Sequence, residues 1–167
     1  MPTIKKARTS RSGSKSGVDA ISLLKKDHEK VRGLLKRLES AADRGDDRAE
    51  ELLAQVDREV KIHSQVEEEI FYPAFKEAAR TKEENKLFFE ATEEHHVVDL
   101  VMPEVHESEG GDEDFAAKTK VLKDLIEHHA EEEEKQMFPK AKKLIGREEL
   151  QELGRRIKAR KQELGAE

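Results

Sequence analysis

Apolar residues recur at intervals of three and four along most of the chain, which is the spacing of one face of an α-helix. The pattern predicts four long helices and a shorter charged one, over about 19–42, 47–80, 82–107, 114–144 and 147–163. Asp19 is placed to cap the first helix, and Arg44-Gly45-Asp46 and Gly110-Gly111 provide turns. Long helices joined by short loops imply antiparallel neighbours. We therefore predict an all-α, antiparallel up-down four-helix bundle with a short C-terminal extra helix.

Each long helix carries a histidine in the middle of its apolar face, and two of the helices also carry an inward glutamate. The histidines are His28, His63, His95 and His129, and the glutamates are Glu67 and Glu133. Spacings of three and four keep these residues on the buried faces, so in a bundle they point to a common axis. Burying one of them without a partner is costly. A polar hydrogen-bonded layer would satisfy a single histidine, whereas a metal ion explains all six residues.

Composition supports this picture and limits the kind of site. Charged residues make up 42% of the 167 residues and aromatic residues 4%, a balance typical of long solvated helices. Cysteine is absent, so a transition metal would be held by imidazole and carboxylate groups. No apolar run has the length of a membrane span or of a secretory signal, so we expect a cytoplasmic protein with no membrane partner.

Charge also divides the chain. Residues 1–17 hold five basic residues and no acidic one, although the chain as a whole has a net charge of -6. We expect a basic disordered tail at 1–17, the bundle at 18–145 and the charged helix at 146–167. Five dispersed charges without interleaved aromatic residues give little support to a nucleic-acid partner. We expect a monomer or a weak dimer.

The second half of the bundle repeats the first. His63 and Glu67 form a His-x3-Glu pair, as do His129 and Glu133, and a proline lies ten residues after each of these histidines. The two helix pairs are offset by 66 to 67 residues, and Phe71-Tyr72-Pro73 corresponds to Met137-Phe138-Pro139. This repetition indicates a duplicated helix pair.

The pattern of a histidine followed by His-x3-Glu, occurring twice with a proline after each motif, resembles the hemerythrin-like HHE cation-binding family. The resemblance implies two non-haem iron ions, bridged by carboxylates and a solvent oxygen, that react with peroxide, dioxygen or nitric oxide. It also implies that the four inward histidines are ligands and that Glu67 and Glu133 bridge or chelate the pair.

The chain departs from the oxygen carriers of that family, because it has Asp99 where their third helix has a second histidine. One imidazole is therefore missing. A site richer in carboxylate favours redox reaction or sensing over reversible oxygen storage. Tyr72 and Asp99 are possible additional ligands, and His96 and Glu68 are further candidates. Tyr72 follows Glu67 by five residues, which on a regular helix points it away from His63, although Pro73 can distort that turn.

Three functions remain open from the sequence. The first is an enzyme with catalase-like peroxide consumption or ferroxidase activity. The second is a non-enzymatic sensor or store for oxygen, nitric oxide or iron. The third is a metal-free interaction bundle. We expect His128 to be a solvent or outer group, His106 to be a surface residue, and Pro103 to bend the third helix.

Overall fold

The structure is a computed structural model that describes residues 17–108 and 111–166. Most of the predicted basic tail lies outside the described residues. The helices, in chain order, are α1 (Ala20–Asp43), α2 (Arg48–Val66), η1 (Glu67–Phe71), α3 (Tyr72–Ala78), α4 (Lys82–Glu107), α5 (Glu113–Glu132), η2 (Glu133–Met137), α6 (Phe138–Leu144) and α7 (Arg147–Glu163). The predicted all-α class is confirmed.

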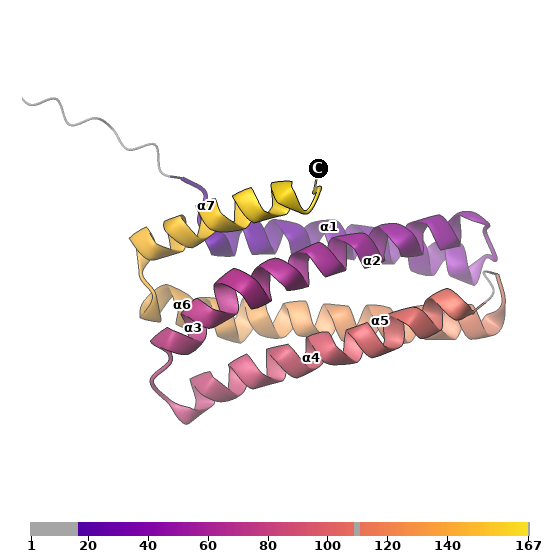
Figure 1. Ribbon diagram of the computed structural model, residues 1–167. Coiled ribbons are helices and arrows are strands. Elements are labelled where there is room, and N and C mark those ends of the chain that lie inside the picture. The colour runs from indigo at the N-terminus through magenta and orange to yellow at the C-terminus, as the bar shows by residue number, and fades with distance from the viewer. Residues whose placement is uncertain (1–16, 109–110, 167) are drawn as a thin grey trace, which may run out of the picture.

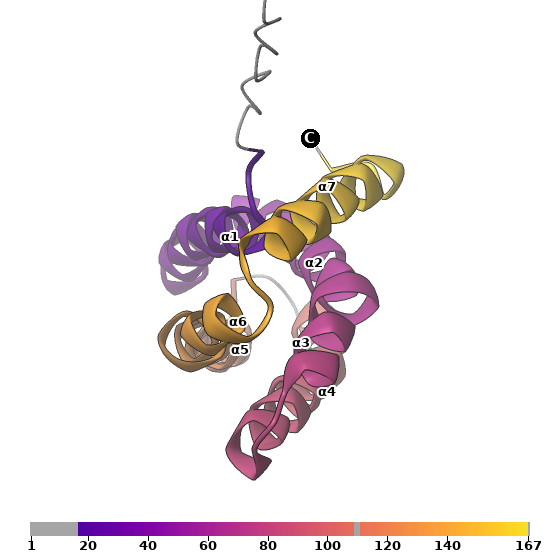
Figure 2. The ribbon, with the colours of Figure 1, turned by 90° about the vertical axis from the view of Figure 1, so that its left-hand side faces the viewer.

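These helices form four antiparallel rods and one covering helix (Figure 1). The rods are α1, α2–η1–α3, α4 and α5–η2–α6, and α1 packs on both α2 and α5. Viewed along the bundle, α7 lies outside the four rods on the side of α1 and α2 (Figure 2). The predicted up-down four-helix bundle with an extra C-terminal helix is therefore confirmed. None of the described helices is long and apolar enough to cross a membrane.

Side-chain caps fix where three of the rods begin. The Asp19 carboxylate accepts a hydrogen bond from the Ser22 N–H at 2.8 Å, as the sequence predicts. Thr81 and Glu84 form a reciprocal capping box at the start of α4. Asp112 accepts from the Phe115 N–H at the start of α5. Each cap satisfies an N–H that the first turn of a helix leaves without a partner, and so sets the register of the rod.

The apolar core is divided into two clusters by the polar residues at mid-height. One cluster lies at the end formed by α3, α6 and α7 and includes Phe71, Phe75 and Phe138. The other lies toward the α1–α2 and α4–α5 turns and includes Leu35 and Leu53. The inward histidines and glutamates are buried between these two clusters. Apolar packing on both sides therefore holds a desolvated polar layer in place.

The second and fourth rods are not the uninterrupted α-helices that the periodicity predicts. Each contains a π-helical turn, η1 starting at Glu67 and η2 starting at Glu133. The Tyr72 N–H bonds to the Glu67 carbonyl, five residues back. Pro73 and Pro139 follow these turns. Proline lacks an N–H, and its ring clashes with the carbonyl four residues back, so the widened turn accommodates the proline and shifts the helix face that follows.

Helix α7 packs on the chain before α1 at one tightly spaced position. A methyl group added at Gly154 would lie 2.9 Å from the Ala20 nitrogen and closer still to the Val18 carbonyl oxygen. We expect Gly154→Ala to lower the free energy of unfolding by about 1–3 kcal/mol because backbone atoms must move. Gly33→Ala, an exposed helical position with nothing within 4 Å, is the control and should raise stability by about 0.5–1 kcal/mol. Urea unfolding gives the free energy of unfolding of both variants. If Gly154→Ala and Gly33→Ala change it equally, α7 is not tightly packed at Gly154.

Candidate metal centre

The four inward histidines meet in the middle of the bundle, one from each rod. Their Nε2 atoms face each other in two pairs, with 3.0 Å between His28 and His63 and 3.1 Å between His95 and His129. The first pair comes from α1 and α2, and the second comes from α4 and α5. All four rings are buried. Each half of the duplicated sequence therefore contributes one pair of imidazoles.

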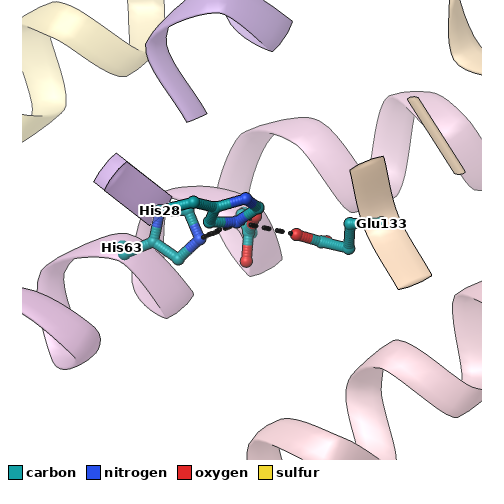
Figure 3. Close-up of side chains that lie close together, drawn as sticks. His28, His63 and Glu133 are labelled. Carbon is teal, nitrogen blue, oxygen red and sulfur yellow. Dashed lines mark hydrogen bonds and ion pairs between the residues drawn. The ribbon is translucent and has the colours of Figure 1, made fainter. Parts of the chain in front are cut away.

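The two inward glutamates connect these pairs. Glu67 places Oε1 3.1 Å from the Nε2 of His63 and Oε2 3.1 Å from the Nε2 of His95. Glu133 places Oε2 3.2 Å from the Nε2 of His28, and Figure 3 marks this contact with a dashed line. The residues form two donor groups, His28–His63–Glu67–Glu133 and Glu67–His95–His129. Glu67 belongs to both groups, with one carboxylate oxygen directed to each half of the site.

Every one of these histidines has a carboxylate on its other ring nitrogen. The Nδ1–carboxylate pairs are His28 with Glu134 (2.8 Å), His63 with Asp27 (3.1 Å), His95 with Glu68 (2.7 Å) and His129 with Glu94 (2.7 Å). An ionised carboxylate only accepts hydrogen bonds, so each Nδ1 donates, and the Nε2 lone pair of a neutral ring points inward. This arrangement orients an imidazole for metal binding and raises its basicity.

Sequence reasoning did not identify this outer shell. Asp27, Glu94 and Glu134 are not among the candidates named from the sequence, and Glu68 is named there only as a possible ligand. A usable signal was present, because an acidic residue precedes His28 and His95 in the chain, and another follows each inward glutamate. The pairing of these acids with the rings depends on which helices are neighbours.

The site holds excess negative charge when no cation is bound. Burial lowers the pKa of His63, but the charge of Glu67 and the hydrogen bond that His63 donates to Asp27 outweigh burial and raise that pKa to about 10. Burial also opposes the charged forms of His95 and His129, and neighbouring carboxylates nevertheless raise the pKa of both. Burial raises the pKa of Glu67, and the surrounding imidazoles lower it well below its usual range. Protons therefore bind where a metal cation would.

Two buried oxygen atoms test whether a metal fits. Among the described residues, Glu67 Oε1 and Glu133 Oε2 are buried and receive no hydrogen bond. Each of them faces an imidazole nitrogen at 3.1 to 3.2 Å without the geometry of a hydrogen bond. Buried polar atoms without partners are costly, and imidazole with carboxylate is a donor set that suits first-row transition metals. The residues present therefore fit a metal cation.

Tyr72 is close to both glutamates and to the second imidazole pair. Its hydroxyl donates to Glu133 Oε1 at 2.8 Å and lies 3.2 Å from His95 Nε2 and 3.5 Å from His129 Nε2. On a regular α-helix, a residue five positions after Glu67 would be rotated by about 140° from it. The π turn η1, in which the Tyr72 N–H bonds the Glu67 carbonyl, reduces that rotation and directs Tyr72 inward, where its hydroxyl meets Glu133. The Glu67–His95–His129 group has one residue fewer than the other group, and the structure places the Tyr72 oxygen beside it.

The other predicted candidates lie elsewhere. Asp99 and His96 are exposed, and neither belongs to the two buried groups. Asp99 is therefore a correction to the sequence-based candidates: one turn beyond His95, the rod directs it to solvent rather than to the centre.

The two remaining histidines lie at the surface. His106 is exposed and lies 3.2 Å from Asp57. His128 is 64% exposed and faces Glu94 and Glu132. His128, Glu94 and Glu132 form a third group toward the surface, which is joined to the centre through the bond between Glu94 and His129.

A small cavity adjoins the four histidines. Its volume is about 30 Å³, and its other lining includes Val31, Val60, Val98 and Ile126. One water molecule needs on the order of 10–15 Å³ measured in this way. The cavity therefore has room for a molecule of two or three heavy atoms, and its apolar wall would exclude bulk water from the side of the centre away from Tyr72.

Metal binding should become weaker as the pH falls. His63, with a pKa raised to about 10, carries a proton at pH 7, and that proton must leave before Nε2 binds a cation. We expect the apparent affinity for Zn²⁺ to rise about tenfold per pH unit between pH 6.5 and 8.5 for each proton released. Competition with a chromophoric chelator measures this slope, and an affinity independent of pH would contradict it.

Comparisons with known proteins agree with this geometry. The family model of the hemerythrin HHE cation binding domain matches residues 19–141, which is most of the chain. The crystal structure of a hemerythrin HHE cation binding domain-containing protein from Mycobacterium kansasii is similar at a TM-score of 0.76 and 27% identity, over 88% of this chain and 87% of that one. No curated protein sequence matches significantly. The chain belongs to the hemerythrin HHE cation-binding family.

Proposed function

We propose that this chain binds two iron ions at its centre and uses them to react with peroxide, dioxygen or nitric oxide. The observation that carries the proposal is the position of Glu67, which directs one oxygen to each of two imidazole pairs. A carboxylate shared in this way suits two cations held side by side, and the match to a cation-binding family supports a metal here. Imidazole with carboxylate is a donor set that suits iron. Two bound irons would supply one-electron redox chemistry.

The protein's own residues would bind the metals and control access to them. His28, His63 and Glu133 would hold one ion, and His95 and His129 the other, with Glu67 bridging between them. The outer carboxylates would keep the Nε2 atoms directed inward.

Tyr72 and the small cavity would determine what reacts. The Tyr72 hydroxyl holds a proton at Glu133 Oε1, inside the site, and is positioned to deliver or accept it. Burial raises its pKa well above the usual range, and the charges of Glu133 and Glu67 act in the same direction, so the phenol stays protonated while no metal is bound. The cavity would admit a small diatomic molecule or peroxide and exclude larger reductants.

Metal analysis and a peroxide assay test the proposal. Protein produced with iron should contain close to two irons per chain, and the double variant His63→Ala/His129→Ala should contain almost none. Sustained oxygen evolution from peroxide would identify a catalase-like enzyme, and catalytic oxidation of Fe(II) would identify a ferroxidase. Spectral changes with nitric oxide or dioxygen without turnover would instead favour a sensor or store. Iron retained in full by the double variant would contradict the proposed centre.

A further inference from the structure

Helix α7 is held firmly against the half of the bundle that carries His28 and His63. Leu150, Leu153 and Ile157 are buried in the apolar cluster at that end. Helix α7 contacts α1, α2 and η1, and Figure 2 shows it lying on the side of α1 and α2. This helix begins after residue 141, where the match to the family model ends. It is therefore an addition to the matched domain whose position relative to the centre is fixed by packing.

One side chain of α7 reaches the outer shell of the centre. The Lys161 ammonium donates to Asp27 Oδ1, and the other oxygen of Asp27 lies 3.1 Å from His63 Nδ1. Asp27 is 9% exposed, and the Lys161 side chain is 19% exposed. A partly desolvated Lys161–Asp27–His63 chain thus connects α7 to a histidine of the centre.

The other histidine–carboxylate pairs do not depend on α7. Glu134, which bonds His28, is paired with Arg32 of α1 at 2.9 Å. Glu94, the counterpart of Asp27 in the second half, faces His128 of α5 at 3.6 Å. Both of these partners lie within the region that matches the family model. Asp27 differs, because its partner Lys161 lies beyond residue 141. Among the outer carboxylates of the described residues, it alone bonds a cation from outside the matched region.

We infer that Lys161 is a positioning residue of the metal centre, which fixes the Asp27 carboxylate so that it orients His63. Both oxygens of Asp27 are engaged in different directions, Oδ1 by Lys161 and Oδ2 by His63. Without the ammonium, Oδ1 would have to turn toward water or another donor, and the bond to His63 would loosen. The effect on metal binding rests on the proposed function, whereas the effect on the His63 ring does not.

The test compares Lys161→Met with Arg160→Met. Both changes remove an α7 cation that is paired with the bundle, because Arg160 bonds Glu69 at 2.7 and 3.1 Å, but only Lys161 touches Asp27. In the metal-free proteins, nitrogen-15 NMR of the imidazole groups reports the His63 Nδ1–H hydrogen bond. In a second measurement, a chelator competition gives the affinity for Zn²⁺.

We expect Lys161→Met to shift the His63 Nδ1–H signal and speed its exchange with water, and to weaken Zn²⁺ binding about tenfold, the lower end of the effect of losing an outer partner. Arg160→Met should leave both unchanged. If Lys161→Met behaves like Arg160→Met, or binds Zn²⁺ more tightly because only a repelling charge was removed, the inference is wrong. A full-length protein that binds no metal would overturn the proposed centre, and the His63 signal would still decide the role of Lys161.

Discussion

Replacement of Glu67 by alanine is expected to remove both metal ions, whereas the same change at Glu133 removes at most one. Glu67 lies in both donor groups, with one oxygen 3.1 Å from His63 and the other 3.1 Å from His95. Glu133 belongs to one group only. Loss of an outer partner alone weakens metal binding about 10- to 100-fold, and loss of a direct ligand should exceed that range. Glu67→Ala should therefore affect two ions together.

The comparison needs proteins with equal folding. Glu77→Ala, at an exposed position of α3, is the control for loss of a glutamate charge and should retain two ions per chain. Metal content after dialysis against a weak chelator gives the stoichiometry, and circular dichroism shows whether each variant keeps its helices. Two ions retained by Glu67→Ala would exclude a bridging role for this residue. One ion lost from each variant would mean that Glu67 and Glu133 serve the two halves separately.

The duplication explains why the centre is built from crossed pairs. Within each helix hairpin, the acid before the first histidine bonds the second histidine, as Asp27 does for His63 and Glu94 does for His129. Between hairpins, the acid after the inward glutamate bonds the first histidine of the other half, as Glu134 does for His28. Each ring is thus fixed by its own helix and by the carboxylate of another helix. For His28 and His95 that carboxylate comes from the other hairpin, so the complete centre forms only when the two hairpins dock.

The helix periodicity was sufficient to predict the four rods and the inward direction of the histidines. Spacings of three and four residues place His63 and Glu67 on one face whatever the neighbours are. The cap at Asp19 was equally predictable, because its partner lies three residues away. These features depend on contacts that are local in the chain.

The features that escaped prediction depend on distant contacts or on altered helix geometry. Glu134 and His28 are 106 residues apart in the chain, so their pairing follows from helix docking rather than from any local pattern. The π turn η1 is set by a shifted hydrogen bond, and without that shift Tyr72 would be assigned to the wrong face. Asp99 was predicted as a possible ligand because it follows His95 by four residues, but its side chain is exposed. Regular helical spacing was therefore misleading at this position.

Replacement of Tyr72 by phenylalanine is expected to abolish the visible colour of the oxidised, iron-loaded protein while leaving its iron content near two per chain. The hydroxyl of Tyr72 lies 3.2 Å from His95 Nε2 and 3.3 Å from Glu67 Oε2, close enough to share a cation with these donors. Burial of the phenol, together with the nearby Glu133 and Glu67 carboxylates, raises its pKa and keeps it protonated without metal, and a ferric ion would displace that proton. A phenolate bound to ferric iron absorbs visible light.

The chain contains a single tyrosine, so a phenolate band has one possible source. Phenylalanine preserves the ring that stacks on His95, at 5.3 Å between centroids, and removes only the hydroxyl. The variant also leaves Glu133 Oε1 without its donor, which should cost about 1–3 kcal/mol in the metal-free protein. Optical spectra of both proteins at equal iron content decide between two roles. Loss of the band makes Tyr72 a ligand, whereas identical spectra would restrict it to donating a hydrogen bond to Glu133.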